Sequence, residues 1–270
     1  MSEPIDFEGI FICTVSSSHR KNFLFATLWS LLSQIKNATW LIELDDYMMI
    51  ENEYEIRALA ENNDNHIVVG SSTYVSKDEK SLGNMRAELF RNANESCSPR
   101  QPCILKLDDD YAIPYETLKQ IAASSSHREF SHCFPTLDVY NSAKHVDWDV
   151  KPKHVSDMMK HVQSYGIDSI NHQRWIGLAN NIVVEQLTSL CLLNLSHESL
   201  HELCDKLRKL KRGERGEDMI IKKHVKEFLL HPTHYAWHMG VHDHEKHWQT
   251  ETPDLTVQRL KTKAHVEGKR

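Results

Sequence analysis

Glycine and proline are scarce in this sequence, which contains 9 and 8 of them among 270 residues. Such scarcity is not typical of disordered chains, and 26% charged and 40% hydrophobic residues are ordinary proportions for a globular protein. No run of about eighteen apolar residues occurs, so we expect no transmembrane segment. The acidic start lacks the basic and apolar regions of a secretory signal, so we expect a cytoplasmic protein.

Paired cysteines and basic stripes are missing as well. The six cysteines show no CxxC spacing, and in a reducing compartment we expect free thiols, several of them in the core; a Cys97–Cys103 disulfide is the alternative. The formal net charge is −6 and no basic stripe stands out, which argues against a nucleic-acid partner. Histidine is abundant instead, with 18 residues concentrated toward the C-terminal half, and composition alone does not account for them.

Strands and helices alternate along the first half of the chain. Short apolar segments rich in β-branched residues predict buried strands, and amphipathic stretches predict helices. We expect strands at 9–15, 40–44, 66–69 and 103–107, and helices at 20–35, 51–60, 84–93 and 115–123. This alternation is typical of βαβ units and a parallel sheet. We therefore predict an α/β fold with a Rossmann-like, mostly parallel sheet flanked by helices, in a single large domain.

The second half of the chain has weaker patterns. Strands are predicted at 130–139 and 176–184, and helices at 187–210, with a break near Asn194, and at 217–224.

Three consecutive carboxylates, Asp108, Asp109 and Asp110, follow the strand at 103–107. In open parallel sheets, ligands bind outside the carboxyl ends of the strands. If the chain stays extended, Asp108 and Asp110 point the same way and can hold Mg²⁺ or Mn²⁺ together with water or diphosphate oxygens. The other interpretation is a solvated acidic turn.

A second acidic pair, Glu217–Asp218, precedes an apolar helix. Acidic residues in a first helical turn stabilise the helix through its dipole, which is the structural interpretation of this pair. The functional interpretation is a general base presented at a fixed angle by the helix start.

Six histidines lie close together near the C-terminus, with Trp237 and Trp248 among them. They are His231, His234, His238, His242, His244 and His247. Neutral imidazole is a ligand for Mn, Fe and Zn ions, but the spacing matches neither HExxH nor a zinc finger. We expect one metal ligand from this group.

The order of these segments resembles glycosyltransferase family 2 and its GT-A-fold relatives, over roughly residues 9–245. The segments that carry the resemblance include an opening strand with its polar turn and helix, a strand ending in an acidic pair, a Gly/Arg-containing helix, a DxD motif, a later strand and an "ED" motif. They lie at 13–34, 41–46, 81–92, 104–114, 177–184 and 216–221. The resemblance implies a GT-A catalytic domain at 1–250, with a nucleotide-binding half at 1–110 and an acceptor half at 111–250, and a polar tail at 251–270.

The resemblance also implies roles for particular residues. Asp218 corresponds to the catalytic base of inverting members, with Glu217 beside it. The metal ligands for Mn²⁺ or Mg²⁺ would be Asp108, Asp110 and His238. The pair Asp109/Asp110 is the alternative register of the motif, and His242 and His244 are rivals of His238. The contacts to the donor nucleotide or its sugar would be Thr14, Ser16, Asp45, Arg86 and Asp109. Trp175 would stack on an acceptor sugar, unless it is simply a half-buried aromatic residue.

The implied reaction is metal-assisted, inverting transfer of a sugar from a nucleotide diphosphate sugar, with a UDP-sugar favoured, to an acceptor hydroxyl. The acceptor is expected to be a saccharide, a glycolipid or a protein, and a glycolipid would bring peripheral membrane contact. Three alternatives stay open: a sugar-phosphate nucleotidyltransferase, an inactive GT-A-like binding module, and a metallohydrolase built on the histidines. The first is disfavoured because residues 16–21 contain no glycine-rich loop.

Overall fold

The computed structural model describes residues 3–16, 21–44, 64–70, 81–97, 100–134, 136–138, 190–211, 216–225, 228–231, 234 and 236–238. The predicted helix at 51–60, the predicted strand at 176–184 and the tail at 251–270 lie outside these residues. Asp45, Trp175, His242, His244 and His247 lie outside them too.

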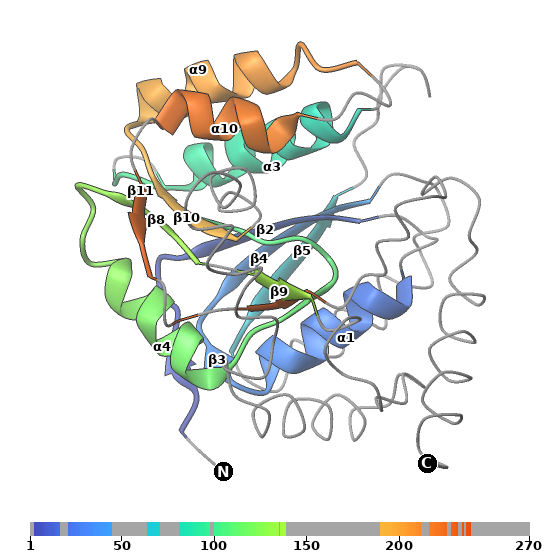
Figure 1. Cartoon of the computed structure of the whole chain (residues 1–270), viewed down its shortest axis with the longest axis vertical. Helices are drawn as coiled ribbons and strands as arrows, with labels where there is room; N and C mark the ends of the chain where they lie inside the picture. The colour runs from blue at the N-terminus through green and yellow to red at the C-terminus, as the bar shows by residue number, and fades with distance from the viewer. Residues whose placement is uncertain are drawn as a thin grey trace.

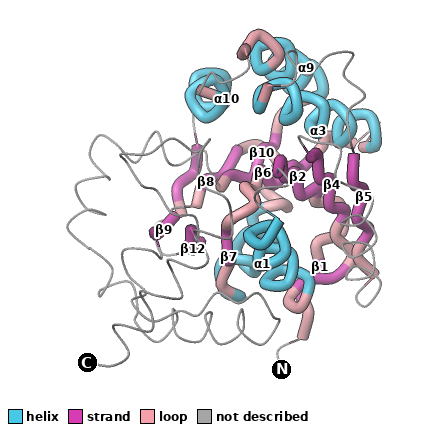
Figure 2. The backbone as a smooth tube through the Cα atoms, turned by 90° about the vertical axis from the view of Figure 1, so that its right-hand side faces the viewer, coloured by secondary structure: helices cyan, strands magenta, loops and turns pink. Residues whose placement is uncertain are grey.

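A seven-stranded sheet forms the centre of the protein, with strand order β11-β8-β10-β6-β2-β4-β5 (Figures 1 and 2). Its strands are β2 Phe11–Ser16, β4 Thr39–Leu44, β5 His66–Gly70, β6 Cys103–Lys106, β8 Ser131–Cys133, β10 Cys191–Asn194 and β11 Phe228–Leu230. Strands β6, β2, β4 and β5 pair in parallel, and β11 is parallel to β8. Only β10 runs antiparallel to its neighbours within this described sheet. The predicted mostly parallel α/β sheet is therefore confirmed.

Helices cover both faces of this sheet. Helices α3 (Leu82–Ser96), α9 (His197–Leu207) and α10 (Glu217–Val225) lie on one face, and α1 (Lys21–Leu32) and α4 (Tyr115–Ser124) lie on the other (Figures 1 and 2). Neighbouring residues of one strand therefore enter different cores: Ile12 packs with α1, whereas Cys13 packs with α3. Burial on both faces explains why the strands are continuous apolar runs.

Two small sheets complete the described fold. Strand β1 (Ile5–Asp6) pairs with β3 (Ile35–Lys36), and β12 (Ala236–His238) lies between β7 (Tyr111–Ala112) and β9 (Thr136–Asp138). In the β12–β7 register, His238 is opposite Tyr111. The backbone of His238 therefore lies beside the residue that follows Asp110.

One predicted element is wrong and another is divided. The segment Cys191–Asn194, predicted as part of a helix at 187–210, is strand β10, and the helix α9 begins only at His197. A short apolar run fits a buried strand as well as a helix, and pairing with β6 and β8 decides for the strand. The strand predicted at 130–139 is divided into β8 and β9.

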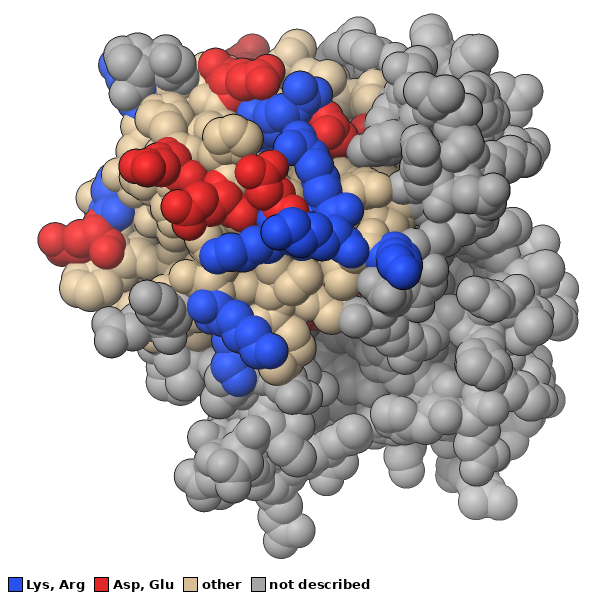
Figure 3. Space-filling view, turned by 90° about the horizontal axis from the view of Figure 1, so that it is seen from above, with Lys and Arg blue, Asp and Glu red and all other residues tan. Residues whose placement is uncertain are grey.

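The face formed by α3, α9 and α10 carries charges of both signs (Figure 3). Arg91 pairs with Glu88 and Glu95, and Arg208 pairs with Glu88 and Asp205. In the described part of the chain, no helix is long and apolar enough to cross a membrane. All six cysteines are free thiols, so the alternative disulfide between Cys97 and Cys103 is wrong.

Candidate active site

The three consecutive aspartates lie at the carboxyl end of β6, where the parallel strands β2 and β6 both end. The chain does not stay extended there, because Asp109 and Asp110 form a turn that leads into β7. The condition under which Asp108 and Asp110 were expected to point the same way is therefore not met. Asp109 is buried, and its Oδ2 accepts a hydrogen bond from Ser16 Oγ at 2.6 Å. Its backbone carbonyl accepts another from Thr27 Oγ1 of α1 at 2.8 Å. The last residue of β2 and the helix that follows it therefore fix the turn.

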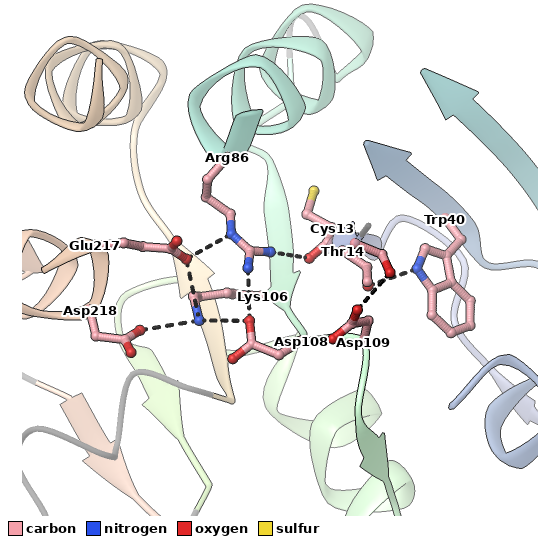
Figure 4. A network of polar contacts seen from close by, with 10 residues as sticks. Cys13, Thr14, Trp40, Arg86, Lys106, Asp108, Asp109, Glu217 and Asp218 are labelled. Carbon is pink, nitrogen blue, oxygen red and sulfur yellow. Dashed lines mark hydrogen bonds and ion pairs between the residues drawn. The ribbon is translucent and has the colours of Figure 1, made fainter. Parts of the chain in front are cut away.

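Arg86 of α3 connects the first aspartate to the second acidic pair (Figure 4). This guanidinium is 1% exposed, and all three of its nitrogens donate hydrogen bonds. Nε donates to Glu217 Oε1 at 2.8 Å, Nη1 to the Cys13 carbonyl at 2.7 Å and Nη2 to Asp108 Oδ1 at 2.8 Å. Arg86, predicted as a donor contact, thus ties together β2, the end of β6 and the start of α10.

Lys106, the last residue of β6, is a member of this site that the sequence reasoning did not single out. Its side chain is 1% exposed, and its Nζ lies 3.2 Å from Asp108 Oδ1, 3.5 Å from Glu217 Oε1 and 3.1 Å from Asp218 Oδ1 (Figure 4). The sequence does contain one sign of this role, a single cation inside an otherwise apolar strand. A lysine is almost never fully buried unless it is paired with opposite charges.

Glu217 and Asp218 are the first two residues of α10, as we predicted from this acidic pair. The two side chains differ in exposure: Glu217 is 6% exposed, whereas Asp218 is 38% exposed. Glu217 Oε2 is buried and has no hydrogen-bond partner among the described residues. Asp218 Oδ1 is also buried, has no hydrogen-bond partner among the described residues, and forms an ion pair with Lys106 Nζ.

Two cations and three carboxylates share this largely buried network. Burial alone would lower the pKa of Lys106, but Asp108, Asp218 and Glu217 raise it above its ordinary value. The pKa of Arg86 is raised in the same way, by Glu217 and Asp108 against the effect of burial. Burial raises the pKa of Glu217, and the two cations only partly oppose this. Both cations therefore stay charged, which stabilises the carboxylates that remain ionised.

Three other residues were predicted to belong to the site, namely Thr14, Asp45 and His238. Thr14 is fully buried and accepts a hydrogen bond from Trp40 Nε1 at 3.0 Å, so its described contact is with the core (Figure 4). Asp45 is outside the described residues. The backbone of His238 is described in β12, but its side chain is not.

The aspartates can supply the carboxylate part of a metal site. Hard divalent cations bind carboxylate oxygens, and Mg²⁺ commonly takes only one or two carboxylates, completed by water and substrate phosphates. Asp108 Oδ1 is engaged by Arg86 and Lys106, which leaves Oδ2 for a cation, and Asp110 lies in the adjoining turn. No group of three His, Cys, Asp or Glu residues that could hold a metal occurs among the described residues. Asp110 is 2% exposed, so a cation bound at Asp108 would need most of its ligands from water or a diphosphate.

Two of the described histidines contact each other away from this network. His132 Nδ1 and His231 Nε2 are 3.0 Å apart, and the ring of His231 stacks on Phe134. Burial lowers the pKa of both histidines, that of His231 to about 4. Among the described residues, His231 therefore lies in a packed cluster of rings with His132 and Phe134.

The sequence matches no protein-family model, and no curated protein matches it. Among the solved structures to which its structure is similar, three illustrate the low identity. GlyE, a glycosyltransferase of Streptococcus pneumoniae TIGR4, has a TM-score of 0.48 and 9% identity over 97% of this chain and 64% of GlyE. LgtC, a galactosyltransferase solved with donor and acceptor sugar analogs, has a TM-score of 0.42 and 8% identity over 95% of both chains. WbbM, a bifunctional glycosyltransferase, has a TM-score of 0.46 and 12% identity over 86% of this chain and 40% of WbbM.

This chain thus spans less than two thirds of the length of GlyE. Because these TM-scores and identities are low, what the chain binds or transfers has to be argued from its own residues. The resemblance to glycosyltransferase family 2 stays a prediction.

Proposed function

We propose that this chain is a GT-A-type glycosyltransferase that transfers a sugar from a nucleoside diphosphate sugar, with a UDP-sugar favoured, to an acceptor hydroxyl. The observation that carries the proposal is the meeting of the two acidic motifs. Asp108, at the end of β6, and Asp218, at the start of α10, both contact Lys106 Nζ, although they come from opposite halves of the chain. Ligands bind outside the carboxyl ends of strands in such sheets, and a carboxylate base beside that site could take the proton of an acceptor hydroxyl.

Asp218 is the proposed general base. Its side chain is partly exposed at a helix start, so it can accept a proton from a hydroxyl that approaches from solvent. As the acceptor oxygen forms its bond to the anomeric carbon, the bond from that carbon to the diphosphate breaks and the electron pair leaves with the diphosphate. The acceptor proton passes to Asp218, and the anomeric configuration inverts. Glu217 is too buried for this role and keeps the helix start attached to Arg86.

Asp108 and Asp110 would hold the divalent cation, Mn²⁺ or Mg²⁺, which when bound would neutralise charge that develops on the departing diphosphate. Asp109 and Ser16 support this turn through their mutual hydrogen bond. The acceptor class is left to the experiment: a saccharide, a glycolipid and a protein all present hydroxyl groups.

Calorimetric titration tests the donor half of the proposal. The wild-type chain and Asp110→Ala are titrated with UDP, GDP, CDP and TDP, each with and without Mn²⁺. Glu116→Ala, which removes an exposed carboxylate of α4, is the matched control. Binding of one diphosphate that needs both Mn²⁺ and Asp110, but not Glu116, is the expected result. Absence of binding to every diphosphate in both metal conditions would overturn the proposal.

Turnover tests the catalytic half. Asp218→Asn should bind the same diphosphate as the wild type. It should no longer release that diphosphate from the nucleotide sugar. A wild-type chain that binds the diphosphate but turns over no donor with any acceptor class would favour the inactive binding module.

A further inference from the structure

Lys106 contacts both Asp108, just beyond the end of β6, and the proposed general base Asp218. Its backbone lies in the middle of the sheet, where it pairs with Cys13 of β2 and Cys191 of β10. Its Nζ reaches Asp108 on one side and Asp218 on the other, at 3.2 and 3.1 Å. Arg86 makes comparable contacts to Asp108 and Glu217, but it has no described contact with Asp218.

The side chain of Asp218 is divided between the interior and the surface. Its Oδ1 atom is buried near Lys106, yet the side chain as a whole is 38% exposed. The exposed surface therefore belongs to its other atoms, which leaves Oδ2 as the oxygen that can meet an acceptor hydroxyl. An ion pair at Oδ1 restricts rotation of the carboxylate, so it sets the direction in which Oδ2 points.

We propose that Lys106 is a positioning residue, which fixes the Asp218 carboxylate against the central strand and thereby sets its place relative to the Asp108 end of the site. The proposal rests on the proposed transferase function, since it assigns Lys106 a role through the base of that reaction. A base attached to the rigid middle of a sheet keeps its position better than one held by surface contacts alone. A displacement of about 1 Å in such a group can cost about 100-fold in rate.

Four proteins test this role: the wild type, Lys106→Met, Asp218→Asn and the double variant. The readout is UDP release from UDP-glucose and from UDP-galactose in the presence of Mn²⁺, with UDP affinity measured by calorimetry. Lys106→Met should lower kcat by about 100-fold and leave KM and the Kd for UDP within about threefold of the wild type. The double variant should be no slower than Asp218→Asn, because Lys106 acts through a carboxylate that is already lost.

Two results would overturn the role of Lys106. One is a kcat of Lys106→Met within about threefold of the wild type, and the other is a double variant whose loss is the product of the two single losses. Thermal unfolding of each variant controls for misfolding. Lys106→Met leaves the Asp218 carboxylate without its cation, and the double variant removes that carboxylate as well. The double variant should therefore fold even if Lys106→Met does not.

A crystal structure of Lys106→Met tests the positioning without turnover. The Asp218 carboxylate should be displaced or rotated, and an unmoved carboxylate would refute the inference even if neither UDP-sugar is a substrate. Failure of the transferase proposal is recognised separately, as a wild type that binds no diphosphate or an Asp218→Asn variant with full activity.

Discussion

Replacing the buried guanidinium of Arg86 should strongly destabilise the protein. Arg86→Met keeps most of the apolar stem but removes three hydrogen bonds, to Glu217, Asp108 and the Cys13 carbonyl. The Cys13 carbonyl still accepts from the Leu107 amide, whereas the two carboxylates are left with Lys106 as their remaining described cation.

The expected loss follows from burial. Removing one partner of a buried ion pair costs about 3–5 kcal/mol, because the other charge stays behind without compensation. That is a large share of the roughly 5–15 kcal/mol by which native proteins are stable. Arg91→Met is the matched control: Arg91 lies on the same helix and pairs with Glu88 and Glu95, but it is 49% exposed. Such surface pairs contribute about 0–1 kcal/mol.

The pH dependence gives a second check. Burial raises the folded-state pKa of Glu217 above its ordinary value. The contribution of Glu217 to the free energy of unfolding is therefore fully present below the ordinary carboxyl pKa of about 4.3. It is lost as the pH rises through the raised folded-state pKa of Glu217. Arg86 lowers that pKa by attraction, so its removal raises the pKa further. The deficit of Arg86→Met should accordingly be smaller near pH 5 than near pH 7.5.

Urea denaturation followed by circular dichroism measures both quantities. The midpoint should fall for Arg86→Met without a change in the slope m, and it should hardly move for Arg91→Met. A deficit for Arg86→Met no larger than that of Arg91→Met, or one that grows toward acidic pH, would refute the reasoning.

Three further predictions concern packing and thiols. Gly83→Ala would place a Cβ 2.4 Å from the Leu207 carbonyl, so the free energy of unfolding should fall by about 1–3 kcal/mol despite the better helix propensity of alanine; an unchanged urea midpoint would contradict this. Trp40→Phe loses the hydrogen bond to Thr14 and should cost about 1 kcal/mol or more by the same assay. Of the six cysteines, only the partly exposed Cys97 should react quickly with iodoacetamide in the native state, as mass spectrometry of the labelled peptides can show; rapid labelling of a buried thiol would contradict the packing.

The sequence by itself determined the longer described strands and helices of the first half. The strand predicted at 103–107 is β6, and the helix predicted at 84–93 is the core of α3. Continuous apolar runs and helical periodicity are local signals, so they can be read without knowing what each element packs against. The same holds for the start of α10, where the acidic pair marks the first helical turn.

Local signals failed where pairing partners decide the conformation. Residues 191–194 carry an apolar run that a helix could accommodate, and only the open position between β6 and β8 makes them a strand. The very short strands β7 and β12 likewise exist because each completes the other's hydrogen bonds. A segment of two or three residues carries too little pattern to be recognised alone.

For the candidate site, the sequence supplied the acidic motifs and the tertiary structure decided how they are joined. Arg86 and Glu217 are 131 positions apart, and they meet because α3 and α10 pack on the same face of the sheet. Lys106 is a single charge in an apolar strand, and although Asp108 follows it closely along the chain, no local pattern indicates that it also contacts Glu217 and Asp218. A buried cation needs opposite charges close by, and which ones it receives depends on the packing of distant helices over the strand.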